Sequence, residues 1–352
     1  EISECLVGSE MCIRDRLNSY VNEQIKDHDK YLIFLDEIQH VRSFEKVLAS
    51  FRATLNCSIF ITGSNSKLLS GKMATLLVGR CVEFRIMPFS FAESYEYATA
   101  IGRNMSPDEF MIDYINWGGF PLRFSFTKES DIKRYLEQTY EGILDKDIIT
   151  DRSKVNRQNF ERVATYIMAN AGKDFSSKNI ENYFIHQNAD TLDKKTIYRY
   201  LDKMEKACLI DRVKRFNIVG KQAMSYIEKQ YAVDTGFRMI NTNLVNFEDT
   251  FFLENIIYNE LKARDYEVFT GKTYKGEIDF VAINGRKKCF IQVAYYLAGK
   301  ETIEREFGAF KPISDASPKY VFSLDRFDYS RDGIAHINIV DFLLGKKDIN
   351  LS

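Results

Sequence analysis

The sequence predicts an α/β protein of several domains, with an open parallel sheet in its N-terminal part. Two apolar runs, YLIFLDEIQ at Tyr31–Gln39 and CSIFITGSNS at Cys57–Ser66, each end in polar residues, as buried parallel strands do. The segment Val41–Leu55 between them has apolar residues at helical spacing. A chain of 352 residues also exceeds the usual size of one domain.

The composition is that of a globular protein, with 45% hydrophobic and 28% charged residues. No apolar run approaches the roughly 20 residues that cross a bilayer, so we expect no membrane partner. The net charge of −1 means that any binding to nucleic acid must come from a local basic patch. The six cysteines show no paired spacing, which predicts a reduced, cytoplasmic protein.

The first sixteen residues, EISECLVGSEMCIRDR, have neither the pattern of a signal peptide nor that of a helix or strand. They look like translated adapter sequence, so we expect a non-native tail at 1–16. The alternative is a genuine irregular N-terminus.

Further along the chain, Val82–Met87 is a third apolar run and predicts a strand closed by Pro88. The pattern then becomes helical from Ser90 to about Ile149, with a turn at Trp117–Pro121.

Two adjacent acids, Asp36 and Glu37, follow the first apolar run. Hydrolysis of a nucleoside triphosphate needs one carboxylate to hold Mg²⁺ and a second to orient or deprotonate water. We assign the metal role to Asp36 and the base role to Glu37. The alternative for Asp36 is a helix cap.

Polar residues also follow the second run. Ser64 and Asn65 come after it and are placed to contact the water or the γ-phosphate. Arg80 follows the next loop, and arginine suits the stabilisation of charge on a transferring phosphoryl group. The alternative for Arg80 is a surface ion pair.

Three segments of the chain resemble the second half of the AAA-type P-loop ATPases of bacteria and archaea. They are LIFLDEIQ, ITGSNSKLLSG and LVGR…FRIMPFSFAE. The resemblance covers Tyr31–Asp341 and implies ATP and Mg²⁺ as cofactors. It implies Walker B roles for Asp36 and Glu37, a sensor role for Ser64 or Asn65 and a catalytic role for Arg80. It also implies a restriction-endonuclease-like domain at the C-terminus.

One feature of that family is absent from the sequence. No GxxxxGK[ST] segment precedes Asp36, and Gly8 is the only glycine before Gly63. Without the amides and the lysine of that loop, the β- and γ-phosphates lose their cradle. We therefore expect an N-terminally truncated ATPase that binds ATP productively only in its full-length form.

The region Val155–Phe237 predicts helices followed by a hairpin, Leu209–Phe216 and Ser225–Val233, the order of a winged helix. The helix before this hairpin has a basic outer face that could contact DNA phosphates. The alternatives are a solvated face and docking of a protein partner. The candidate DNA contacts are Lys194, Lys195, Arg199 and Lys203.

The segment Gly276–Leu297 predicts a hairpin around an Asn284-Gly285 turn. It resembles the PD-(D/E)xK nuclease core, with Asp279 as metal ligand and Gln292 in the (D/E) position. Ala294 stands where that motif needs lysine, so we predict a degenerate nuclease site. Its acidic set is Glu277 and Asp279 with Glu254 or Glu260 from the preceding helix.

These expectations give five segments. They are a tail (1–16), an incomplete P-loop NTPase core (17–90), a helical lid (91–150), a winged helix (151–245) and an α/β restriction-endonuclease-like domain (246–352). The expected function is ATP hydrolysis coupled to the C-terminal module. The alternatives are a metal-dependent nuclease and a non-enzymatic DNA-binding module, and the expected partners are DNA, another protein or a second copy of the chain.

Overall fold

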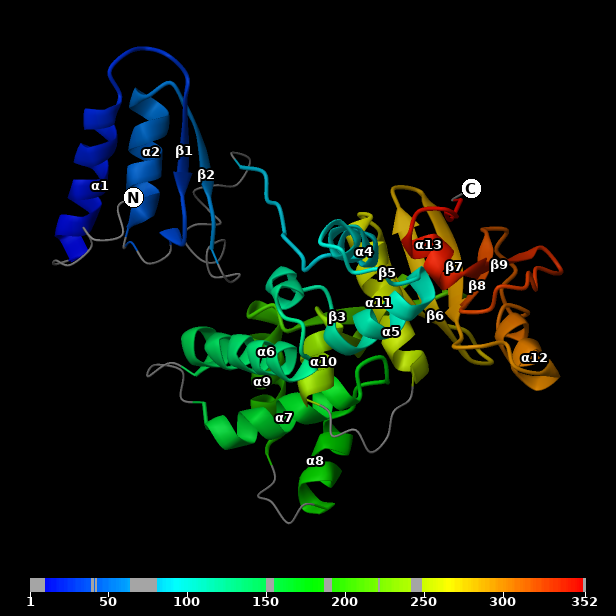
Figure 1. Cartoon of the computed structure of the whole chain (residues 1–352). Coiled ribbons are helices and arrows are strands. Elements are labelled where there is room, and N and C mark those ends of the chain that lie inside the picture. The colour runs from blue at the N-terminus through cyan, green and yellow to red at the C-terminus, as the bar shows by residue number, and fades with distance from the viewer. Residues whose placement is uncertain are drawn as a thin grey trace. The chain divides into compact units, whose positions relative to one another are not determined.

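The computed structural model describes residues 10–38, 41, 43–63, 81–149, 155–186, 192–220, 222–241 and 249–350 (Figure 1). The chain divides into two compact units, residues 1–85 and 86–352, and each is described by itself.

Unit 1 contains two parallel strands and two helices: α1 (Glu10–Gln24), β1 (Tyr31–Leu35), α2 (Phe44–Thr54) and β2 (Cys57–Ile61). The strands pair without a register shift, from Tyr31 opposite Cys57 to Leu35 opposite Ile61. The predicted parallel pair with an intervening helix is therefore confirmed. Because the strands are parallel, their carboxyl ends lie at the same edge.

One face of this sheet is covered by helix. The apolar side of α2, which includes Val47 and Phe51, packs against Ile33 and Ile59 of the strands. On the opposite face Phe34 and Phe60 stack with ring centroids 4.8 Å apart, and both remain exposed.

Two sequence predictions for the first 87 residues were wrong. Residues 10–16, expected to lack regular structure, form the first half of α1. Residues 82–87, expected to be a strand, form none, and Val82, Phe84 and Ile86 are 77%, 79% and 90% exposed. Alternation of apolar residues suits a strand, but a strand also needs a neighbour to pair with, and within the described residues β1 and β2 pair only with each other.

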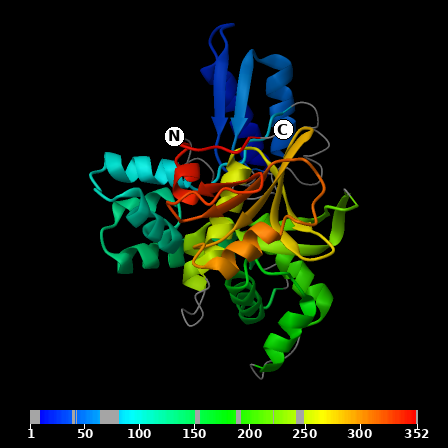
Figure 2. The same cartoon turned by 90° about the vertical axis from the view of Figure 1, so that its right-hand side faces the viewer.

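Unit 2 consists of helices and one large sheet (Figures 1 and 2). Its first part contains α4 (Phe91–Ala100), α5 (Pro107–Trp117), a 3₁₀ turn (Pro121–Ser125), α6 (Glu129–Ile143), a π turn (Leu144–Ile148), α7 (Arg157–Ala169), α8 (Ser177–His186), α9 (Lys194–Lys206), β3 (Ile210–Asn217), β4 (Gln222–Ala232) and α10 (Thr235–Asn241). Its second part contains α11 (Asp249–Ala263), β5 (Glu267–Lys272), β6 (Glu277–Asn284), β7 (Lys287–Val293), α12 (Lys300–Gly308), β8 (Lys319–Ser323), β9 (Ile334–Asn338) and α13 (Ile339–Leu343).

The seven strands form one mixed sheet in the order β4-β3-β5-β6-β7-β8-β9. The β3–β4 hairpin, expected as the wing of a winged helix, is the edge of this sheet, because β3 pairs in parallel with β5 from Arg215 opposite Thr270 to Asn217 opposite Lys272. The sheet therefore continues across the boundary that the sequence suggested at 245–246. The winged-helix and restriction-endonuclease-like assignments stay predictions.

Alternation along the strands divides the unit 2 core between the two faces of the sheet. Phe280 and Ile291 point to the side where α11 packs. Val281 and Phe290 point to the other side, where Phe307 of α12 packs. This arrangement holds the buried carboxyl groups of α11 and β6 close together.

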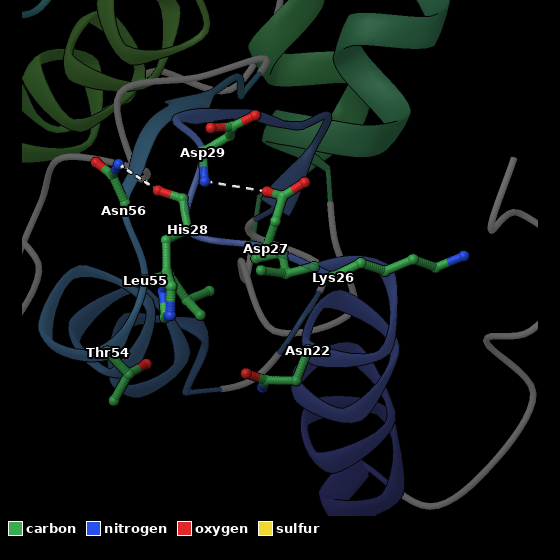
Figure 3. Close-up of a pocket in the computed structure, with 9 residues that line it drawn as sticks. Asn22, Lys26, Asp27, His28, Asp29, Thr54, Leu55 and Asn56 are labelled. Carbon is green, nitrogen blue, oxygen red and sulfur yellow. Dashed lines mark hydrogen bonds between the residues drawn. The ribbon is translucent and has the colours of Figure 1, made fainter.

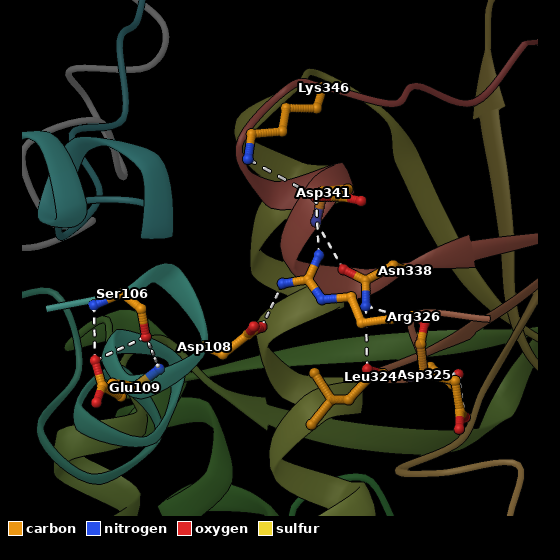
Figure 4. A network of polar contacts seen from close by, with 10 residues as sticks. Ser106, Asp108, Glu109, Leu324, Asp325, Arg326, Asn338, Asp341 and Lys346 are labelled. Carbon is orange, nitrogen blue, oxygen red and sulfur yellow. Dashed lines mark hydrogen bonds and ion pairs between the residues drawn. The ribbon is translucent and has the colours of Figure 1, made fainter.

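The loop between β8 and β9 is tied to α5 by Arg326 (Figure 4). The guanidinium contacts Asp108 at 2.5 Å and Asp341 at 3.2 Å. Asn338 fixes the same loop, donating from its amide to the carbonyls of Leu324 and Asp325 at 3.1 Å.

The WGGFP turn predicted at 117–121 is held by a buried carboxylate. Asp234 accepts the amide of Gly119 at 2.7 Å and that of Gly236 at 2.8 Å. Burial raises the pKa of Asp234 to about 6. A side chain at Gly119 would place Cβ 2.0 Å from the carbonyl oxygen of Phe89. Only glycine fits there.

No helix in the described part of the chain is both long and apolar enough to cross a membrane.

We expect Gly119→Ala to destabilise the protein by about 2 kcal/mol or more, because the new methyl group would clash with a backbone carbonyl group that can move only by distorting the chain. Gly142→Ala in α6 is the matched control. Its Cβ meets nothing within 4 Å, and alanine favours a helix by about 1 kcal/mol over glycine. Urea denaturation measures both, and equal midpoints would contradict this explanation.

Candidate functional site

The carboxyl ends of β1 and β2 bring three polar residues together. Asp36 and Glu37 follow β1 directly, and Thr62 follows β2 directly. The side chains of Asp36 and Thr62 are exposed, and Glu37 is half-buried. This is the edge at which open α/β sheets bind their ligands.

Thr62 connects the two strand ends through its hydroxyl group. The hydroxyl donates to the Asp36 carboxylate and accepts the backbone N–H of Glu37 at 3.0 Å. The Thr62 backbone also donates to the carbonyl of Leu35 at 3.0 Å and accepts the N–H of Ile38 at 3.3 Å. A single residue therefore contacts four consecutive residues at the end of β1.

The backbone of Glu37 is held in an uncommon conformation. Its φ of 48° lies in the left-handed region, which costs a non-glycine residue about 1–2 kcal/mol. The contact with Thr62 and the burial of Ile38 hold this turn in place. Backbone strain of this kind is found at ligand sites, where it aims a side chain in a required direction.

Thr62 was not predicted from the sequence, which pointed to Ser64 and Asn65, two and three residues later in the chain. The available signal was position: Thr62 is the first polar residue after β2, as Asp36 is after β1, and the last strand residues Leu35 and Ile61 are paired. Ser64, Asn65 and Arg80 lie outside the described residues, so their roles stay predictions.

A pocket of about 380 Å³ lies at the opposite edge of unit 1 (Figure 3). It is lined by the residues before each strand, among them Asp27, His28 and Asn56. Asn56 donates from its side chain to the carbonyl of His28 at 3.0 Å. This pocket is at the amino ends of the strands and contains neither Asp36 nor Glu37, so we do not assign the nucleotide to it.

The basic residues proposed for DNA contact lie on α9. Lys194, Lys195 and Arg199 are exposed. Lys203 is half-buried, and its ammonium donates to the carbonyl of Ile148 at 3.3 Å. Lys203 therefore helps to hold the π turn, and a role in DNA binding stays a prediction for all four.

A buried charge cluster occupies the region that resembled a nuclease site. At its centre is Lys229 of β4, whose ammonium lies 2.9 Å from the Glu277 carboxylate and 3.7 Å from that of Glu254. Tyr231 donates its hydroxyl to Glu254 at 3.3 Å. Arg215 of β3 contacts Glu277 at 3.7 Å. Lys229 was not predicted from the sequence, because the nuclease motif places its lysine at position 294, directly after β7.

Burial and charge shift the ionisation of this cluster. Burial raises the pKa of Glu254 to about 7 although Lys229 opposes the change. Burial and the neighbouring Glu254 raise the pKa of Asp279 well above its ordinary value. Burial lowers the pKa of Lys229, but the surrounding carboxylates outweigh it and the net shift is upward. The lysine therefore stays charged, while the carboxyl groups of Glu254 and Asp279 hold their protons more tightly.

Two other residues predicted for the nuclease-like site make different contacts. Gln292 accepts the backbone N–H of Asp279 through its side-chain oxygen at 3.2 Å. Glu260 of α11 pairs with Arg264, the residue directly after that helix, at 2.7 Å. Of the acids named from the sequence, Glu254, Glu277 and Asp279 come together around Lys229, and Glu260 instead joins the Arg264 pair.

Proteins similar in sequence to most of this chain occur in Haemophilus influenzae and Methanocaldococcus jannaschii. A protein of Haemophilus influenzae, described as uncharacterized, is 31% identical over 319 residues, which are 90% of this chain and 78% of the relative. The chain belongs to the family of this protein. An uncharacterized protein of Methanocaldococcus jannaschii is 29% identical over 345 residues, 93% of this chain and 75% of that protein.

Two family models match parts of the chain. A model described as an AAA domain matches residues 8–95, and one described as a domain of unknown function matches residues 108–248. The first match supports a P-loop ATPase-like fold for the N-terminal part and indicates an ATPase-like domain. The second ends between the β3–β4 hairpin and α11, within the region joined by the seven-stranded sheet.

Among solved structures, the chain is similar to the Walker-type ATPase of Pyrococcus abyssi, with 16% identity, a TM-score of 0.40 and coverage of 67% of this chain and 68% of that one. It is also similar to a protein of Vibrio cholerae, with 12% identity, a TM-score of 0.22 and coverage of 96% and 80%.

We expect Thr62→Val to release the turn at the end of β1, because valine keeps the shape of threonine but has no hydroxyl. One lost hydrogen bond of about 1 kcal/mol corresponds to roughly fivefold faster exchange of the Glu37 amide. Hydrogen exchange followed by NMR measures the change. Thr62→Ser keeps the hydroxyl and should exchange as the native protein does. Equal exchange in all three proteins would contradict the role of Thr62.

Proposed function

We propose that unit 1 is part of a nucleoside triphosphatase site and that Asp36 and Glu37 are its acidic residues. The observation that carries the proposal is the meeting of Asp36, Glu37 and Thr62 at the carboxyl edge of a parallel strand pair. The AAA-domain match over residues 8–95 supports it.

The donor groups at this edge suit a magnesium nucleotide. Mg²⁺ prefers oxygen ligands and keeps several of its waters, so one or two carboxylates at an exposed edge are sufficient protein ligands. Asp36 is exposed, and its position is set by Thr62. In this proposal Asp36 holds the hydrated Mg²⁺ of the nucleotide.

Glu37 is proposed to orient and deprotonate the attacking water. In a continued strand, alternation would decide the face of the sheet to which the Glu37 side chain points. The left-handed backbone of Glu37 breaks this alternation and sets a different direction for the side chain. The Mg²⁺–ATP substrate supplies the phosphoanhydride bond that breaks and the charge that lowers repulsion toward the water. Ser64 or Asn65 and Arg80 complete the proposed site as sensor and charge-stabilising residues.

Unit 2 is proposed as the module on which this ATPase acts. The similarity to the Haemophilus influenzae relative extends over 319 residues and so includes residues of both units. A pair of units maintained together in one chain is consistent with coupling between them.

The test is ATP hydrolysis by the protein expressed from its complete coding sequence. We expect Glu37→Gln to lower kcat about 10²–10⁴-fold, the usual contribution of a positioned base, while ATP binding is retained. Asp36→Asn should instead weaken the Mg²⁺ dependence of binding. Isothermal titration and a phosphate-release assay separate the two effects.

The matched control is Asp29→Asn, which removes an exposed acid at the other end of β1. It should leave kcat and binding unchanged. Retention of full kcat in Glu37→Gln, or an equal loss in Asp29→Asn, would overturn the proposal.

A further inference from the structure

The charge cluster around Lys229 joins parts of unit 2 that are distant in the sequence. Arg215 and Lys229 come from the β3–β4 hairpin, Glu254 from α11, and Glu277 and Asp279 from β6. Asp174, in the segment between α7 and α8, adds an ion pair with Arg215 at 2.5 Å. The cluster therefore lies where the region before residue 245 meets the region after it.

A nuclease-like fold implies a divalent cation among these carboxylates, so the geometry must be tested against that requirement. The aspartate expected to bind the metal is engaged by the backbone: Oδ2 of Asp279 accepts the N–H of Val293 at 2.8 Å. Gln292 is occupied by the N–H of Asp279. Within the described part of the chain, no group of three or more His, Cys, Asp or Glu side chains is arranged to hold a metal ion.

The two carboxylates that face the centre of the cluster already share a cation. Glu254 and Glu277 both contact the ammonium of Lys229, a residue that is only 5% exposed. A buried carboxylate pair without a counter-charge would be very unfavourable, so this ammonium performs the neutralising role that a metal would have. A divalent ion at the same place would compete for both carboxylates with an ammonium that lies 2.9 Å from Glu277 and 3.7 Å from Glu254, and the two cations would repel each other.

We propose that the Lys229 ammonium takes the place of a metal ion in this charge cluster and that it excludes a divalent metal. The charge cluster then holds the β3–β4 hairpin, α11 and β6 together, and it is not a hydrolytic centre. We call it the structural joint of unit 2. This inference is independent of the ATPase proposal, because it concerns only residues of unit 2.

The joint explains features that a metal site does not. The hydroxyl of Tyr231 and the ammonium of Lys229, both from β4, approach the same Glu254 oxygen, at 3.3 Å and 3.7 Å. Glu277 similarly receives Lys229 and Arg215 on one oxygen. The contacts of Glu254 therefore hold α11 to the hairpin, and those of Glu277 hold β6 to it.

The test removes Lys229 from the full chain. All proteins in the test also carry Asp36→Asn and Glu37→Gln, so that the acidic pair of unit 1 cannot bind the added metal. In this background the Lys229-containing protein should show the same melting temperature in excess MnCl₂ as in EDTA. Lys229→Ala should melt lower in EDTA and regain several degrees in MnCl₂, because the vacated carboxylates accept Mn²⁺.

Two further variants make the result specific. Lys229→Arg keeps the positive charge and should not respond to Mn²⁺, and Lys229→Ala with Glu254→Gln should lose the response because a ligand is gone. If Lys229→Ala does not fold in EDTA, the proposal requires that it refold in MnCl₂.

Three results would overturn the proposal. One is a Mn²⁺ response of the Lys229-containing protein that Glu254→Gln abolishes. Another is a Lys229→Ala protein that folds but ignores Mn²⁺. The third is a Lys229→Ala protein that folds in neither condition.

Discussion

The parallel, in-register pairing of β1 with β2 is the interaction on which the proposed nucleotide site depends. It places the residue after each strand at one edge, so that Thr62 can hold both Asp36 and Glu37. A shift of one residue would turn the Thr62 hydroxyl to the other face of the sheet and break these contacts. The register in turn rests on the apolar face that Ile33 and Ile59 present to the helices.

In unit 2 the comparable constraint is the neutralisation of buried carboxylates. Glu254 and Asp279 lie almost fully out of solvent, where an unpaired charge is costly. Lys229 supplies the opposite charge from a hairpin that the sequence places in another domain. Charge pairing and strand pairing therefore join the hairpin to the same sheet, which makes the region matched by the family of unknown function continuous with the C-terminal sheet.

Much of the secondary structure could be predicted from the sequence, because periodicity reports burial directly. The β1 and β2 runs, the apolar face of α2 and the turn at Gly285 all follow from local pattern. What could not be predicted depends on contacts between distant residues. Lys229 and Glu277 are 48 positions apart, so spacing gives no signal of their ion pair. The strand predicted at residues 82–87 is absent for a related reason: alternation of apolar residues cannot show whether a neighbouring strand is present to pair with.

Paramagnetic broadening by a Mn²⁺-bound, non-hydrolysable ATP analogue would locate the nucleotide within unit 1. It would be recorded by NMR on the protein expressed from its complete coding sequence. The account predicts selective loss of the amide signals of Glu37 and Thr62, with those of His28 and Asn56 at the other edge unaffected. Broadening at His28 and Asn56 instead, or none in unit 1 under saturating analogue, would contradict it.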